Sequence, residues 1–139
     1  MPQNAAPRTD FTTPPDADCI AALAERAFAA IPDRLRREVD NVGIHVEDMP
    51  DGETLDELGI ESAWDLTGLY RGTPLHRRSV DDIARMPDMI LLYRQPILLE
   101  WVETGEDLYR LVRSVLVHEI AHHFGFSDDD IEAIEREMD

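Results

Sequence analysis

Residues 115–129 read VLVHEIAHHFGFSDD, and this stretch is the most informative part of the sequence for both fold and function. From about Glu106 onward, apolar residues recur at spacings of three and four, which predicts a long helix with one buried face. Gly125 is a natural end for this helix, because glycine readily adopts the left-handed conformation found at helix ends. A last, short and acidic helix is expected over residues 129–138.

His118 and His122 lie four residues apart, so a helix places both imidazoles on one face, about one turn from each other. Such a pair can share one zinc ion, with zinc–nitrogen bonds of about 2.0–2.1 Å. Glu119 is displaced by about 100 degrees around the helix, which keeps it off the metal but close to a metal-bound water. A carboxylate there can act as the general base. The spacing therefore predicts a zinc-dependent hydrolytic site.

A catalytic zinc site usually has a third protein ligand and one open position. Asp128 follows His122 by six residues, beyond the expected turn at Gly125, and is the favoured third ligand. Asp129, Glu132 or a water molecule are the alternatives. Asp128 competes with a second role, because either it or Ser127 could cap the last helix. The two roles are compatible if Ser127 is the cap.

The motif HExxHxxGxxD, at residues 118–128, resembles the metzincin zinc motif with aspartate in place of the usual third histidine. It is more similar still to the minimal zincin-like metallopeptidases of bacteria. The segments HEIAHHFGFSDDDI, LTGLYRGTPL and DMILLYRQPI resemble that family, over roughly residues 20–135. The resemblance implies an α+β fold: a small zincin-like core with a three- or four-stranded sheet packed against the metal-bearing helix. It also implies Zn²⁺ held by His118, His122 and Asp128, with Glu119 as the base.

Two departures from larger metzincins bear on function. No methionine turn follows the ligands, since Met138 is the only later methionine, and little chain remains to build a deep cleft. Both departures speak against efficient general proteolysis, although neither affects metal binding. The motif still predicts a zinc-dependent hydrolase of the peptidase type, acting on a peptide or protein substrate. The alternative is a zinc-stabilised binding or regulatory module without turnover.

The expected organisation is a flexible tail over residues 1–16, rich in proline and polar residues, and a single domain over 17–139. Within the domain, we expect a first helix over about 18–31 and a short helix at 54–59. The expected strands lie at about 42–46, 66–70 and 89–93. Residues 97–101 are apolar, and their pattern leaves a strand and a helix start equally open.

Composition excludes several classes of function. A net charge of −17 argues against binding to nucleic acids and to anionic membranes. All 13 basic residues are arginines, so no lysine can act as a base or Schiff-base amine. Cys19 is the only cysteine, which rules out an internal disulfide and a multi-cysteine zinc site. The start of the chain lacks a secretory signal, so a cytoplasmic location is expected. The oligomeric state is left open.

The remaining histidines and two tyrosines have simpler expected roles. His123 points to another face of the helix than the ligands and is expected at the surface or in support of the site. His45 and His76 lack ligand-like spacing and are expected to be structural or exposed. Tyr70 and Tyr93 could stabilise an oxyanion if they reached the metal, but packing in the sheet is the favoured role for each.

Overall fold

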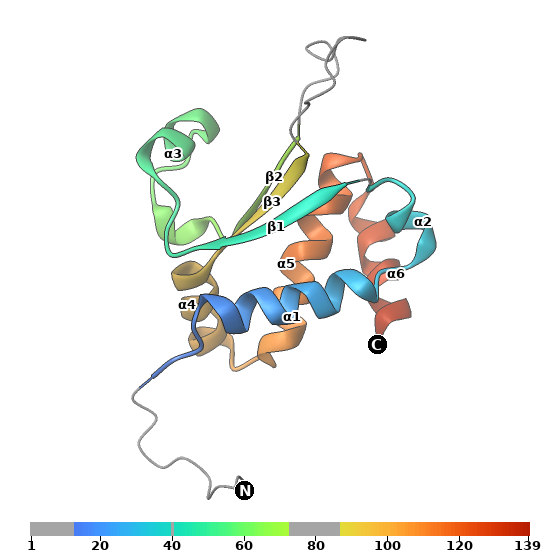
Figure 1. Cartoon of the computed structure of the whole chain (residues 1–139), viewed down its shortest axis with the longest axis horizontal. Coiled ribbons are helices and arrows are strands. Elements are labelled where there is room, and N and C mark those ends of the chain that lie inside the picture. The colour runs from blue at the N-terminus through green and yellow to red at the C-terminus, as the bar shows by residue number, and fades with distance from the viewer. Residues whose placement is uncertain (1–12, 40, 73–86) are drawn as a thin grey trace, which may run out of the picture.

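The computed structural model describes residues 13–39, 41–72 and 87–139, and its elements confirm the expected α+β class (Figure 1). In chain order they are α1 (Ala17–Ala29), α2 (Asp33–Arg36), β1 (Val42–Glu47), α3 (Gly52–Leu58), the 3₁₀ helix η1 (Ala63–Asp65), β2 (Gly68–Arg71), β3 (Asp88–Tyr93), α4 (Arg94–Thr104), α5 (Leu108–His123) and α6 (Asp128–Met138). None of the described helices is long and apolar enough to cross a membrane.

The described strands form one three-stranded sheet in the order β1-β3-β2. Strand β1 runs parallel to β3, whereas β2 runs antiparallel to it. The central strand β3 carries the most continuous buried run, from Ile90 to Tyr93, as expected for a strand with a neighbour on each side. Strand β2 is an edge strand of the described sheet, and this edge faces the HExxH helix through the Tyr70–Glu119 contact.

The two faces of the sheet have different surroundings. Because side chains alternate along a strand, Ile90 and Leu92 point to one face, where they join the core formed with Leu116 and Ile120 of α5. Helix α1 packs against both α5 and β1 on this side. Figure 1 shows α3 on the opposite side of the sheet from α5. We call the two sides the α5 face and the α3 face.

Side-chain caps fix the ends of the helices that matter for the site. Asp107 accepts a hydrogen bond from the backbone N–H of Arg110 at 3.0 Å and so begins α5. Helix α5 ends at His123, and Gly125 follows with a φ of +81°, which confirms the expected stop. Ser127 caps α6 in a reciprocal capping box with Asp130.

Two segments differ from or extend the sequence-based expectation. The second strand begins at Gly68 rather than Leu66, because residues 63–65 form the 3₁₀ helix that precedes it. The apolar segment 97–101 is helical and belongs to α4. Pro96 lies in the first turn of α4, where its missing N–H leaves no hydrogen bond unmade.

Two further expectations fall wholly or partly outside the described residues. Residues 1–12 of the expected tail and His76 are not among them. The end of the expected tail makes specific contacts. The Pro15 carbonyl accepts a hydrogen bond from Arg94 Nε at 2.8 Å, and Asp16 caps α1 by accepting one from the Cys19 N–H at 2.8 Å.

Candidate metal centre

Helix α5 carries His118, Glu119 and His122 in its last turns, on either side of the fully buried Ile120 and Ala121. Its middle part is almost continuously buried, from Leu111 to Val117. His118 and Glu119 are half-buried, and His122 is exposed. The helix therefore anchors the site through its apolar stripe and presents the HExxH side chains near solvent.

The His118 ring is oriented by its own helix. Its Nδ1 lies 2.8 Å from the backbone carbonyl of Ser114, one turn earlier. A carbonyl oxygen only accepts hydrogen bonds, so Nδ1 carries the proton and donates it. The lone pair of Nε2 is then available to a metal, which is the usual arrangement of a metal-binding histidine.

His122 and Asp128 meet across the turn between α5 and α6. The His122 Nε2 and Asp128 Oδ1 atoms are 3.4 Å apart. Because Ser127 caps α6, the Asp128 carboxylate is not needed there, and its side chain is 94% exposed. The structure thus identifies Ser127 as the cap, and the Asp128 carboxylate is left available to bind an ion.

The donor atoms suit zinc in type and, for one pair, in distance. Two ligand atoms bonded to one tetrahedral zinc at about 2.0–2.1 Å lie roughly 3.3–3.4 Å apart, close to the His122–Asp128 separation of 3.4 Å. The His118 and His122 ring centres are 5.8 Å apart with planes at 78°. Within the described residues, however, no three His, Cys, Asp or Glu side chains form a cluster that could hold a metal. The structure brings His122 and Asp128 together, but it does not gather all three predicted ligands.

Glu119 lies between the helix and the edge of the sheet. Its Oε1 accepts a hydrogen bond from the backbone N–H of Tyr70 on β2 at 3.3 Å. Burial raises the pKa of Glu119, while the hydrogen bond from Tyr70 and the nearby His122 and His118 act in the opposite direction. The carboxylate is thereby held in place by an element 49 residues away in sequence.

Gly68 makes this close approach of β2 to α5 possible. A Cβ atom at Gly68 would lie 2.7 Å from Val115 Cγ1 and 3.4 Å from Glu119 Cγ. The first distance is a clash with a side chain of the buried stripe, so only glycine fits this position without a shift. The spacing of residues along the chain does not indicate a role for Gly68, because the contact depends on the tertiary fold.

Tyr70 and Tyr93 are buried in the sheet, and His123 lies at the surface, as expected. The His123 ring is exposed and stacks on the Tyr70 ring, with ring centres 3.9 Å apart. The Tyr70 hydroxyl donates a hydrogen bond to Asp88 Oδ2 at 2.7 Å. Tyr93 lies on the α3 face of the sheet, away from the ligands. His45 is exposed.

Glu135 is a neighbour of the site that lies outside the HExxHxxGxxD motif. Its Oε1 atom is buried and has no hydrogen-bond partner among the described residues, and it lies 3.8 Å from His118 Nδ1. A signal was present, since Glu135 follows Ile131 and Ile134 at helical spacing and therefore borders the buried stripe of α6. Its carboxylate adds negative charge next to the His118 ring.

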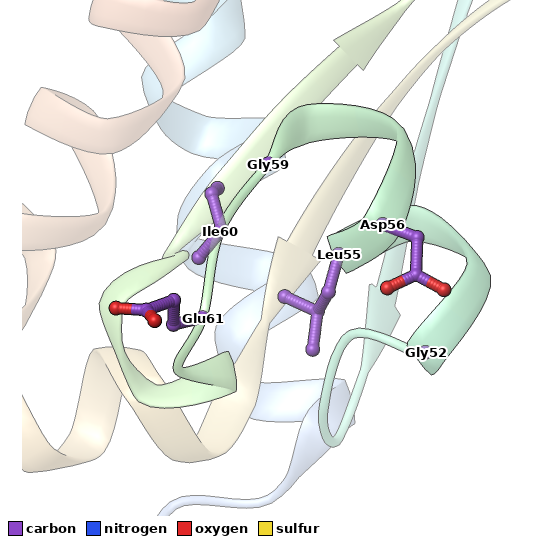
Figure 2. Close-up of a pocket in the computed structure, with 6 residues that line it drawn as sticks. All are labelled: Gly52, Leu55, Asp56, Gly59, Ile60 and Glu61. Atoms are coloured by element: carbon purple, nitrogen blue, oxygen red, sulfur yellow. The ribbon is translucent and has the colours of Figure 1, made fainter.

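A surface hollow lies away from these residues. It has a volume of about 560 Å³ and is formed by α3 and the segment that follows it. Figure 2 shows Leu55, Ile60 and Glu61 around this curved segment. None of the predicted ligands lines it, so it is not part of the candidate metal centre.

Comparison with known proteins supports a zincin-like identity. No curated protein matches the chain. Among solved structures, a conserved hypothetical protein from Thermus thermophilus is 26% identical, with a TM-score of 0.51; the match covers 78% of this chain and 94% of that one. Residues 39–138 match the sequence profile of a family described as zincin-like metallopeptidase. This match covers most of the chain, from β1 through α6, and the chain therefore belongs to the zincin-like metallopeptidase family.

Proposed function

We propose that this protein is a zinc-dependent peptidase in which Glu119 is the general base. The observation that carries the proposal is the position of the Glu119 carboxylate. It lies next to the two imidazoles of one helix and is hydrogen-bonded to the edge strand β2. Membership of the zincin-like metallopeptidase family supports the same reaction class.

His118, His122 and Asp128 are the residues that would hold the ion. His118 offers Nε2, because its Nδ1 is engaged by Ser114, and the His122–Asp128 pair has a spacing suited to zinc. A bound zinc ion supplies Lewis-acid chemistry, polarising a carbonyl and lowering the pKa of its water to about 7.

Glu119 has the properties required for proton transfer. It is half-buried, so its carboxylate is partly shielded from bulk water, and its pKa is raised by that burial. A carboxylate with a pKa nearer to the working pH exchanges protons more readily in both directions. In the proposed reaction, Glu119 removes a proton from the attacking water and returns it to the leaving amine.

The edge strand β2 is the expected site for the substrate backbone. The N–H of Tyr70 is bonded to Glu119 and points away from β3, which identifies the outward side of β2. An extended peptide that adds to this edge would lie beside α5, and main-chain hydrogen bonds would align it.

The experiment compares wild type, Glu119→Gln and His122→Ala. We expect purified wild type and Glu119→Gln to bind zinc alike, and His122→Ala to lose most of it, as measured by elemental analysis. A peptide-library cleavage screen should show turnover by zinc-loaded wild type, reduced at least about 100-fold in Glu119→Gln. Equal turnover by these two proteins would refute the role of Glu119.

The same experiment distinguishes the alternative function. Stoichiometric zinc in wild type, with no cleavage of any peptide in the library, would favour the non-catalytic module stabilised by zinc. Loss of zinc with a lowered melting temperature in His122→Ala would then assign the metal a structural role.

A further inference from the structure

A second hollow lies on the α3 face of the sheet. It has a volume of about 250 Å³, and Thr54 of α3 and Leu91 and Tyr93 of β3 contribute to its lining. This is smaller than the roughly 300–1,000 Å³ of a site for a drug-sized ligand, so it suits one side chain or a small amine. None of the predicted zinc ligands lines it, and the sheet separates it from the core beneath α5.

Tyr93 contributes an unpartnered hydroxyl to this hollow. The residue is only 1% exposed, and its hydroxyl has no hydrogen-bond partner among the described residues. Most hydroxyls of buried residues have a hydrogen-bond partner, so one that borders a hollow without a protein partner is available to a bound molecule. Burial, and then the charge of Glu47, raises the pKa of Tyr93. The phenol therefore stays protonated and can accept a hydrogen bond from a ligand.

The rim of the hollow is strongly acidic. The residues that line the hollow include four with carboxylates and one, Arg71, with a guanidinium group, so the lining has a net charge of −3. The four carboxylates belong to Glu47, Asp51, Glu53 and Glu57. Arg71 is paired with Glu57 at 3.5 Å, and Asp51 caps α3 through the Thr54 N–H at 2.8 Å. Glu47 and Glu53 form no ion pair with any described residue.

These features favour an organic cation over a metal ion. The carboxylates surround the hollow but do not converge, and no three of them form a metal-binding cluster within the described residues. A guanidinium or ammonium group carries several N–H donors, which can reach separate acceptors at once. We propose that this hollow binds a guanidinium or primary ammonium group, with the Tyr93 hydroxyl and the carboxylates of Glu47 and Glu53 as acceptors.

The proposal is independent of the peptidase function, since it uses none of the residues of the metal centre. Such a cation could come from a free amine or from a basic side chain of a peptide. The recognition chemistry is the same, and the experiment below separates the two sources.

The first test uses the full-length protein, kept metal-free with a chelator, and two small probes of nearly equal shape. Both probes are acetylated on the terminal amine, so agmatine carries a guanidinium group as its only charge, whereas N-carbamoylputrescine carries an uncharged urea in its place. We expect agmatine to bind at least about tenfold more tightly by calorimetry, because charged hydrogen bonds are lost with the urea. Amide shifts in NMR spectra should map to residues 47–57 and 91–93.

A tripeptide, N-acetyl-Ala-Arg-Ala-amide, identifies the source. Tighter binding of this peptide than of agmatine would assign the hollow to a peptide side chain, and the reverse order would assign it to a free amine. Either order supports a cation site. Equal affinity for agmatine and its urea analogue, or NMR shifts confined to other surfaces, would overturn the proposal.

Charge-matched variants control for unspecific binding of a cationic probe to this acidic protein. The double variant Glu47→Gln/Glu53→Gln and the control Glu25→Gln/Glu103→Gln remove the same charge from exposed positions. We expect the first to weaken agmatine binding about tenfold and the control to change it less than about twofold. Tyr93→Phe should fold normally, because the hydroxyl it removes has no partner among the described residues, and should weaken binding about fivefold. Equal losses in both double variants, or unchanged binding in Tyr93→Phe at unchanged melting temperature, would refute the assignment.

Discussion

Tyr70 and Tyr93 occupy opposite faces of the same small sheet and are about equally buried, at 7% and 1% exposure. The Tyr70 hydroxyl donates a hydrogen bond to Asp88 of β3, and the Tyr70 ring stacks on His123 of α5. This tyrosine therefore links β2 to both elements. The Tyr93 hydroxyl has no partner among the described residues and borders a hollow. The comparison shows that the protein itself uses the hydroxyl of Tyr70, whereas the hydroxyl of Tyr93 has no partner among the described residues.

The largest expected effect tests whether the two faces differ in packing. Leu92 and Leu91 are neighbours on β3, but Leu92 points into the core and Leu91 lines the hollow. Leu92→Ala should lower the free energy of unfolding by about 2–5 kcal/mol, because it leaves a cavity in the core. Leu91→Ala should lower it by only about 1–2 kcal/mol, since water can enter the vacated space. Urea denaturation measures both, and equal losses would break the comparison.

The next effect concerns the close approach of β2 to α5. Gly68→Ala should destabilise the protein by about 1–3 kcal/mol, because its Cβ would clash with Val115 Cγ1 at 2.7 Å. It should also displace Glu119, and zinc-dependent turnover should fall with it. Gly52→Ala is the control, since a Cβ there meets nothing within 4 Å. A melting temperature for Gly68→Ala at or above that of Gly52→Ala would contradict the predicted clash.

The two tyrosines themselves provide a sharper comparison of single hydroxyls. Tyr70→Phe removes the 2.7 Å hydrogen bond to Asp88 and should cost about 1–2 kcal/mol of unfolding free energy. Tyr93→Phe should leave stability unchanged or slightly higher, because no hydrogen bond to a described residue is lost. Thermal unfolding of the ligand-free protein would show the difference, and a larger loss for Tyr93→Phe would reverse the interpretation of the two faces.

The smallest expected effect is the pH dependence of stability caused by Glu119. Its pKa is raised by burial in the folded state, so the folded protein holds this proton more tightly than the unfolded chain does. The charged carboxylate therefore opposes folding above its raised pKa, and this penalty disappears as the pH falls towards about 4.

Metal-free Glu119→Gln should accordingly be more stable than wild type at pH 8, and the two proteins should converge near pH 4. Urea unfolding at both pH values measures this difference. A stability gap that is independent of pH would show that Glu119 acts through its shape and hydrogen bond rather than its charge. Together with lost turnover, a gain in stability would identify Glu119 as a residue kept for chemistry.

The sequence predicts best what depends on neighbours along the chain. The apolar spacing before His118 gives α5 to within a few residues, and Gly125 marks its end. The pairing of His122 with Asp128 also follows from local spacing, because only a short turn separates them. These features are visible without an alignment, since helix periodicity and cap residues act over one or two turns.

Features that depend on distant contacts are not predictable in this way. Pro96, taken by itself, indicates an interruption of the apolar run, whereas it lies in the first turn of α4. The need for glycine at position 68 arises from Val115, and the hollow beside the Tyr93 hydroxyl arises from the position of α3. Both depend on how elements pack in three dimensions, which spacing along the chain does not encode.

The hydrogen bond from His118 Nδ1 to the Ser114 carbonyl lies within one helical turn. The orientation of this imidazole therefore requires only α5 and no contact with a distant strand. Asp128 reaches His122 only after the turn into α6 has closed, and Glu119 meets Tyr70 only after the sheet has assembled. The three residues thus depend on the tertiary structure to different degrees, because the first donor is oriented within its own helix whereas the base is held only by the assembled sheet.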